Sequence, residues 1–291
     1  MELGPAGTLF VKPEPVLYTF HKIRTQSEQG DLGAWRALLD FYAPAFFRLL
    51  EIHGAMRPRD AAPIVKKMLA EITANGFERL RGTSRQSERE FLGELRALLL
   101  GAALQFVSSQ TPDNTASGAF EPEKITKLLD ELPLLHKEML FFRLAGYTEN
   151  TLERILRMSP RVAEKAFERL TGDYQEARQT EQDRCPWPAA WLAFLKQAGE
   201  LKTEHCIPTH QMVRIHDGQV SWYDKEPVEK HVSGCLHCLE AWTGLREVGY
   251  WRRAAEPLSS SEIDLLLEVI PLEKKPEKKS LLQRLRLGSA R

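Results

Sequence analysis

The sequence lacks an excess of charge of either sign, and it lacks a long apolar run. Lysine and arginine together number 40, and aspartate and glutamate together also number 40. This balance argues against a protein that coats nucleic acid with its whole surface, but it leaves room for a local basic face. Because no apolar run reaches about 18 residues, we expect no membrane span. No signal peptide is evident, so we expect a reducing, cytoplasmic compartment.

The sequence also lacks the motifs of the common catalytic centres. It contains no glycine-rich phosphate loop, no serine nucleophile elbow, no HExxH motif and no acidic pair at a plausible site. No internal repeat is visible either. We therefore expect that the protein is not an enzyme, and we assign no catalytic residue.

Helical periodicity is abundant, whereas strand alternation is weak. The 291 residues, 43% hydrophobic and 27% charged, have an ordinary globular composition and enough length for two or three domains. Apolar residues recur at steps of three and four over residues 35–50, 63–80, 88–107 and 122–158, which is the period of amphipathic helices. Residues 219–223 are the one place where a short extended piece could lie. We predict an all-α fold.

Proline and small polar residues mark where the predicted helices end. Pro44 predicts a kink or break in the first helix. Residues 108–118 (SSQTPDNTASG) contain no large apolar side chain, as is typical of a linker. After the linker, Thr148 is placed to cap a short helix, and Ser159-Pro160 begins another. Two short helices joined by a tight turn form the helix-turn-helix pattern, which any three-helix bundle would also produce.

Cysteine is scarce, and its placement is informative. Three of the four cysteines lie at Cys206 and in the motif His231-x-x-x-Cys235-x-x-Cys238. Cys235 and Cys238 are about one helical turn apart, and His231 precedes Cys235 by the spacing that shares a helix face. The segment between Cys206 and His231 is long enough for a helical hairpin. Four such ligands close a tetrahedral site without an open position, so we predict a structural Zn²⁺.

Other ligands and other roles of the cysteines are open from the spacing alone. The fourth ligand could instead be His205, His210, His216 or Cys185. The thiols could also be buried as small apolar side chains. A disulfide is disfavoured in a reducing compartment.

Residues 200–250 resemble the zinc-binding anti-sigma domain. Members of that family commonly carry a cysteine, a helix, a glycine-containing turn, a second helix and then His-x-x-x-Cys-x-x-Cys. Here Cys206-Ile207-Pro208 opens the segment, residues 215–220 (IHDGQV) occupy the turn, and residues 225–231 (KEPVEKH) supply the second helix. The resemblance implies that Cys206 is the first ligand and that the module clamps a sigma factor.

Residues 28–172 resemble an extracytoplasmic-function sigma factor. The segments that carry the likeness are Gly30–Leu38 followed by Tyr42-Ala43-Pro44, then Asp60-Ala61-Ala62, Leu132-Pro133, Gly146-Tyr147-Thr148 and Leu152–Leu156. In that family the first helical domain melts the promoter and the helix-turn-helix reads the minus-thirty-five element. The resemblance implies a bacterial regulator whose partners are promoter DNA and RNA polymerase.

The sequence departs from the sigma pattern at two surfaces. Lys66 and Lys67 reverse the charge of the helix with which the family binds polymerase, which argues against ordinary polymerase binding. In the recognition helix, Glu164 and Glu168 would oppose a phosphate backbone. The residues that remain as candidates for DNA phosphate contacts are Arg161, Lys165 and Arg169. A solvated helix face would carry the same three side chains.

These segments predict a modular layout. In order, we expect an N-terminal arm (1–27), a sigma region-two-like domain (28–107), a linker (108–121), a helix-turn-helix region-four-like domain (122–178), a zinc anti-sigma-like module (179–252) and a tail (253–291). Within the tail, residues 263–270 are apolar enough to dock on the protein or on a partner, and the end is basic.

The layout predicts a sigma-factor-like transcription regulator. It would bind promoter DNA, RNA polymerase or both, under the control of the fused zinc module. The alternative is a protein–protein interaction module that kept the sigma shape and no longer reads promoters.

Overall fold

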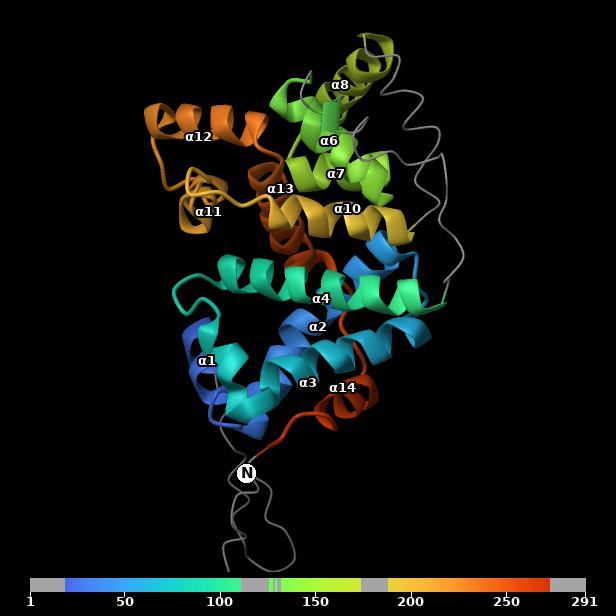
Figure 1. Cartoon of the computed structure of the whole chain (residues 1–291), viewed down its shortest axis with the longest axis vertical. Coiled ribbons are helices and arrows are strands. Elements are labelled where there is room, and N and C mark those ends of the chain that lie inside the picture. Colours follow the sequence, from blue (N-terminus) through green and yellow to red (C-terminus); the bar gives the residue numbers. More distant parts are fainter. Residues whose placement is uncertain (1–18, 111–125, 128, 130–131, 174–187, 273–291) are drawn as a thin grey trace, which may run out of the picture.

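The described part of the chain is entirely helical. The computed structural model describes residues 19–110, 126–127, 129, 132–173 and 188–272, and within them it contains helices and no strand. The all-α prediction is confirmed for these residues, and residues 219–223 form no strand. The helices (Figure 1) are α1 (Phe20–Ser27), α2 (Leu32–Gly54), α3 (Pro58–Gly82), α4 (Glu88–Gln110), α6 (Leu134–Ala145), α7 (Glu149–Leu156), α8 (Pro160–Asp173), α10 (Pro188–Glu200), α11 (Thr209–His216), α12 (Trp222–Gly234), α13 (Leu236–Ala254) and α14 (Ser260–Leu267).

Helix α2 is longer than the sequence predicted. The Asp31 side chain caps it by accepting a hydrogen bond of 2.9 Å from the Ala34 amide. The expected break at Pro44 does not occur, because α2 continues through this residue to Gly54. Ala43 and Phe46, on either side of the proline, are both buried in the core. Their burial on both halves of the helix outweighs the one backbone hydrogen bond that proline removes.

Helix α3 is interrupted where the sequence predicted a continuous helix over residues 63–80. Asn75, Gly76 and Phe77 all have positive φ, at 52°, 66° and 67°. Asparagine and glycine adopt this left-handed region at little cost, whereas phenylalanine rarely does. The turn brings the Phe77 ring onto Trp35, with 6.0 Å between ring centroids. This buried aromatic contact offsets the local backbone strain.

Residues 20–27, which we expected to belong to the N-terminal arm, form helix α1 against α2. Arg24 of this helix is almost completely buried and pairs with Glu28 at 2.6 Å. It also donates to the Leu80 carbonyl and to Thr83 Oγ1, at the end of α3. Helix α1 is therefore a structural part of the first helical bundle. The rest of the arm, residues 1–18, lies outside the described residues.

Helix α6 and the two short helices predicted after it, α7 and α8, are present. Gly146, with φ of 103°, ends α6 in the left-handed conformation that favours glycine. Pro160 begins α8, and the Ser159 carbonyl accepts the first helical hydrogen bonds. The Thr148 hydroxyl does not cap α7 as predicted, since it lies 3.0 Å from Thr151 Oγ1 and bonds to no backbone amide there. Of the predicted linker, residues 108–110 belong to α4 and residues 111–121 lie outside the described part.

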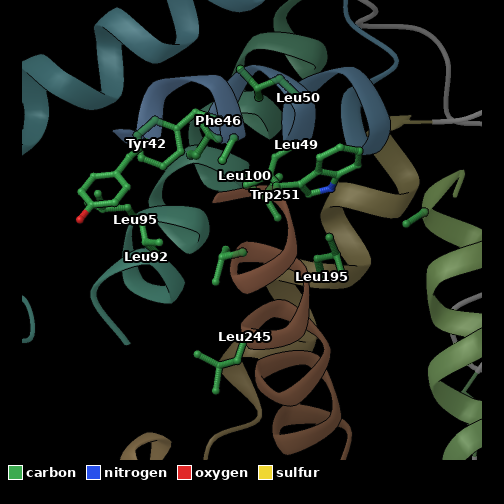
Figure 2. Packing of buried hydrophobic residues seen from close by; sticks show 14 of the residues in the cluster. Tyr42, Phe46, Leu49, Leu50, Leu92, Leu95, Leu100, Leu195, Leu245 and Trp251 are labelled. Atoms are coloured by element: carbon green, nitrogen blue, oxygen red, sulfur yellow. The ribbon is translucent and has the colours of Figure 1, made fainter. Parts of the chain in front are cut away.

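The predicted domains share one apolar core with α13 at its centre. Helix α13 contacts α2 and α4 of the first segment, α6 and α7 of the second, and α10, α11 and α12 of its own. Figure 2 shows Trp251 and Leu245 of α13 in the same cluster as Leu49 of α2 and Leu195 of α10. The boundaries seen in the sequence thus separate stretches of chain that pack around a common interior.

Helix α4 forms one layer of this interior. Over Glu88–Ser109 it is long and apolar enough, by length and composition, to cross a membrane. Phe91, Leu95 and Leu99 are fully buried against other helices of the same chain. The neighbours of α4 are α2, α3, α10, α11 and α13. The apolar residues of α4 are therefore accounted for by packing within the helical body.

The apolar segment predicted to dock on the protein or on a partner does dock on the protein. It forms α14, which a capping box of Ser259 and Glu262 begins. Ile263 and Leu266 are buried where α14 packs on α2 and α3 (Figure 1). Lys66 of α3 lies 3.0 Å from Glu268, at the end of α14. The basic end of the chain beyond this point, residues 273–291, lies outside the described residues.

Candidate metal centre

The structure brings the four predicted ligands together. One ligand atom from each of Cys206, His231, Cys235 and Cys238 lies within 4.8 Å of the others. The Sγ atoms of Cys206 and Cys235 are 3.9 Å apart, which is far longer than a disulfide of about 2.05 Å. All three cysteines are free thiols. Three sulfurs and an imidazole at this separation can surround a single metal ion.

A short helical hairpin positions these residues. Pro208 precedes α11, and Gly218, with φ of 71°, turns the chain back after it. Ser221 then caps α12 by accepting a hydrogen bond of 3.3 Å from the Asp224 amide. His231 lies near the end of α12, while Cys235 is the extended residue between α12 and α13. The hairpin therefore returns the chain to Cys206, and the start of α13 adds Cys238 beside it.

The donor atoms fit a metal ion. The Nε2 atom of His231 is buried and has no hydrogen-bond partner. A buried imidazole nitrogen without a partner is unfavourable unless something else satisfies it. Cys238 is fully buried, whereas Cys206 and Cys235 are partly accessible. A metal ion among the sulfurs would satisfy the histidine and balance the charge of the thiolates.

The cysteines differ in their readiness to ionise. Burial raises the pKa of the Cys238 thiol to about 12, and the neighbouring sulfur of Cys235 adds to this effect. Burial also raises the pKa of Cys206, but hydrogen bonds from Thr203 and the nearby thiols outweigh it and lower that pKa overall. The Thr203 amide donates to Cys206 Sγ at 3.2 Å. Since metals bind thiolates, a metal ion at this place would displace the thiol protons.

The alternative ligands lie elsewhere. His205 has 83% of its side chain exposed, and its nearest charged partner is Glu204. His210 lines a separate cleft beside α4. The His216 ring lies 4.1 Å from that of Trp242, and its Nε2 faces the Trp242 carbonyl at 3.2 Å. Cys185 lies outside the described residues. None of the three histidines joins the four-residue cluster.

A buried polar network on α13, the helix that also carries Cys238, was not predicted from the sequence. Its centre is Glu247 of α13, which is completely buried. His53 Nε2 and Arg96 Nε each lie 2.5 Å from its carboxylate, and the Tyr147 hydroxyl donates to it as well. Because Trp191 Nε1 can only donate, its 2.9 Å contact makes His53 Nδ1 the acceptor and leaves the proton on Nε2. Glu247, in the third predicted domain, therefore accepts hydrogen bonds from residues of the first and second predicted domains.

The electrostatics of this network favour the ionised carboxylate. Burial by itself would raise the pKa of Glu247, but His53, Arg96 and Tyr147 together lower it to about 2. Arg96 has a second carboxylate partner, Glu240, at 2.5 Å. The network is thus an ionised cluster in which each buried charge has an opposite partner, the arrangement that a buried charge requires.

A second set of contacts joins α6 to α12 and α13. Trp242 and Arg246 of α13 donate to the buried carboxylate of Glu138, at 2.7 and 2.6 Å. Lys137 donates to the Ser233 carbonyl near the end of α12. The helix that precedes the predicted helix-turn-helix is therefore hydrogen-bonded to both helices that carry the His-Cys-Cys motif.

The predicted DNA contacts lie on α8, which Figure 1 shows at the end of the molecule opposite α14. Arg161, Lys165 and Arg169 are exposed. Glu164 and Glu168 are exposed on the same helix. The structure thus leaves these five charged side chains at the surface, and it does not bring the three basic ones near the metal ligands.

Comparison with known proteins identifies no relative. No protein-family model, no curated protein and no solved structure matches the chain.

Proposed function

We propose that this chain is a sigma-factor-like transcription regulator whose metal-binding C-terminal half holds it in a closed arrangement. By closed arrangement we mean that α10–α14 pack against α1–α8. The observation that carries the proposal is the position of α13, whose buried Glu247 bonds to His53, Arg96 and Tyr147 of the sigma-like segments. The resemblance of the sequence to sigma and anti-sigma segments supplies the biological role.

The metal in this proposal is Zn²⁺. A set of three thiolates and one imidazole is typical of structural zinc, and softer or harder metals favour other donor sets. Cys206, His231, Cys235 and Cys238 would hold it, and four protein ligands leave no open position for substrate. The ion supplies a cross-link that ties the start of α13 to the α11–α12 hairpin. Its role is therefore to stabilise the fold of the module that faces the sigma-like helices.

In the closed arrangement, α14 lies beside the stretch of α3 that the sigma resemblance assigns to polymerase and pairs with one of its two lysines. Helix α14 packs on α3, and Glu268 pairs with Lys66 in the stretch that corresponds to the family's polymerase-binding helix. A charge-reversing change, Lys66→Glu, would place two carboxylates together and restore an acidic residue on α3. Lys67→Glu is the matched control, because Lys67 contacts the neutral Gln105 at 2.7 Å instead of α14.

The test is retention of RNA polymerase by the full chain from a lysate of the native host. We expect Lys66→Glu to retain more polymerase than the parent protein, and Lys67→Glu to behave like the parent. Both proteins are tested with and without zinc. The proposal would be overturned if neither the parent nor Lys66→Glu retained polymerase or bound promoter DNA in either state.

Promoter binding is the second activity to measure. Helix α8 carries Arg161, Lys165 and Arg169 at the surface, and phosphate contacts of this kind make affinity fall as salt rises. Replacing Arg161 and Arg169 by alanine is expected to weaken promoter binding about uniformly across sequences and to reduce the salt dependence by roughly two phosphate contacts. Unchanged promoter affinity would show that these α8 side chains do not contact the DNA.

A second candidate function is that of a protein–protein interaction module that no longer reads promoters. Glu164 and Glu168 are exposed between the basic residues of α8, where they would repel a phosphate backbone. The core shared by the two halves also makes their separation costly. The two candidates differ in one result: stoichiometric promoter or polymerase binding supports the regulator, whereas stable binding of a different protein without either supports the module.

A further inference from the structure

Two adjoining clefts beside the N-terminal end of α4 share the residues Arg89 and Arg253. The larger cleft, of about 590 Å³, lies between α4, α11 and the end of α13. The smaller, of about 50 Å³, lies between α7 and α13. Figure 1 shows α11 and α13 on one side of α4 in this region. Neither cleft includes a ligand of the metal centre or a side chain of α8.

The smaller cleft is lined by five arginines and by no carboxylate. Arg89 comes from α4, Arg154 and Arg157 from α7 and its end, and Arg246 and Arg253 from α13. Such a concentration of one charge creates a local positive potential, which water and salt screen only in part. Three separate segments of the sequence therefore contribute to a single cationic pocket.

Acidic side chains compensate only part of this charge. Arg89 pairs with Asp217 at 2.8 Å, and Arg246 pairs with Glu138 at 2.6 Å. Within residues 19–110, 132–173 and 188–272, no carboxylate pairs with the three remaining arginines of the cluster, which are Arg154, Arg157 and Arg253. All three side chains are exposed, so an external anion could reach them and neutralise their charge.

The electrostatic effect of this crowding is visible on its members. Partial burial lowers the pKa of Arg253, the neighbouring Arg89 and Arg157 lower it further, and Asp217 offsets part of this effect. The pKa of His216, which also lines the pocket, lies well below its usual value because of burial and the positive charge of Arg246 and Arg89. A bound anion would offset the surrounding positive charge and stabilise the charged form of each group.

The backbone of α13 holds Arg89 in place, and the backbone at Arg157 has a special conformation. A Cβ at Gly249 would lie 2.2 Å from Arg89 Nη1, so the glycine makes room for the guanidinium against α13. Arg89 also donates to the Leu245 carbonyl at 3.1 Å. Arg157 ends α7 in the left-handed conformation, with φ of 55°. Donors that are already positioned lose less freedom when they bind a ligand, which favours affinity.

We propose that the two clefts form one binding site for a phosphate-bearing small molecule of the nucleotide class. Guanidinium groups bind phosphoryl oxygens with paired, charge-assisted hydrogen bonds, and the arginine pocket offers several. The larger cleft adds His210, Gln219 and the carboxylates Glu88 and Glu90, of which Glu88 already pairs with Arg252; such groups suit a sugar or base and not a phosphate. A duplex fits this place less well, because the five arginines converge from α4, α7 and α13 on a cleft of only about 50 Å³ instead of lying along one helix face.

Such a ligand would join α4, α7 and α13 through its phosphates. Because it binds only where these helices lie together, it would stabilise the closed arrangement in proportion to its concentration. The site is separate from the metal centre and does not depend on the identity of the metal. It would make the association of the two halves responsive to a small molecule.

The test is binding of ADP and of inorganic pyrophosphate to the zinc-replete full chain, measured by titration calorimetry at about 0.15 M salt. Sulfate at equal ionic strength serves as the control for general charge effects. The pocket variant is Arg157→Asn with Arg253→Ala, since asparagine tolerates the left-handed backbone at position 157. The matched control, Arg161→Ala with Arg169→Ala, removes the same charge from α8. Metal content is measured after each titration, because pyrophosphate itself binds metal ions.

We expect saturable binding of ADP or pyrophosphate to the parent protein, at least about tenfold weaker binding to the pocket variant, and a change within about twofold for the α8 variant. Three results would overturn the proposal. They are absence of saturable binding to the parent, equal weakening in both variants, and binding of duplex DNA but not of ADP that the pocket variant abolishes. The last result would assign the arginines to a nucleic-acid backbone.

Discussion

The guanidinium of Arg96 lies directly against the backbone of Gly244. A Cβ at position 244 would come within 2.9 Å of Arg96 Nη1 and 3.1 Å of Cζ. On the same pair of helices, a Cβ at Gly93 would lie 3.1 Å from a methyl group of Leu245. Glycines on α4 and α13 thus make room for side chains of the opposite helix, and this close approach allows Arg96 to reach Glu247.

The first prediction concerns this close approach. Gly244→Ala is expected to lower the free energy of unfolding by roughly 1–3 kcal/mol, because Arg96 is held by Glu240 and Glu247 and cannot move aside. Gly101→Ala, on the other helix, is the control. A Cβ there meets nothing within 4 Å, so alanine should stabilise α4 by about 0.5–1 kcal/mol. Chemical denaturation of both variants measures the difference, and equal effects would contradict the packing described.

The second prediction concerns the carboxylate at the centre of the buried network. Glu247→Gln keeps the shape of the side chain but removes the negative charge that Arg96 and His53 face. It also replaces one acceptor oxygen by an NH₂ group, which faces hydrogen-bond donors and has no acceptor there. We expect a loss of about 3–5 kcal/mol in the free energy of unfolding. The control is Glu51→Gln, which removes an exposed pair with Arg48 and should change stability by less than about 0.5 kcal/mol. A small effect of Glu247→Gln would show that the network contributes little.

The third prediction is a loss of stability in acid. The folded pKa of Glu247, about 2, lies below its usual 4.5, so its contribution is complete above pH 4.5 and is lost as the pH falls towards 2. The folded pKa of His216 also lies below its usual 6.5, because burial and neighbouring arginines oppose its charge. Its contribution is therefore present above pH 6.5 and decreases as the pH falls below that value.

Urea unfolding of the zinc-loaded protein across this pH range measures both effects. Glu247→Gln should flatten the dependence below pH 4.5, and His216→Gln should flatten it just below pH 6.5. Parallel curves for the parent and both variants would show that other groups control the acid response.

Local features of the chain were predictable from sequence because their signals are local. The motif from His231 to Cys238 lies within little more than two helical turns, so spacing alone predicts that its side chains converge. Cys206 was identified through its resemblance to a family, and the structure places its sulfur 3.9 Å from that of Cys235. The docking of residues 263–270 could also be anticipated from apolar content.

Long-range contacts left no such signal. Glu247 is separated from His53 by 194 residues and from Arg96 by 151. No spacing rule connects such residues, and each one alone is typical of a solvated helix face. The arginine pocket was not predicted from the sequence for the same reason, because Arg89, Arg157 and Arg253 come from three distant helices. Of the kink or break predicted at Pro44, the break was wrong, because tertiary packing outweighed a local preference.

The fourth prediction identifies the metal ligands. Cys238→Ser and His231→Ala should each lower the bound zinc to well below one ion per chain, because each removes a ligand from a closed site. His205→Ala and His210→Ala should keep the full complement, since both side chains lie away from the cluster. If either control variant lost zinc, the histidine replaced in that variant would be a ligand and the assignment of the fourth ligand would be wrong.

The most direct measurement is the zinc content of the parent protein, purified without oxygen and without added metal. Mass spectrometry under native conditions gives the ion and its stoichiometry for each folded chain. Our account predicts one zinc ion per chain, released together with the fold of α11–α13 when a chelator is added. A folded, metal-free protein whose helix content and stability do not change with zinc would contradict it.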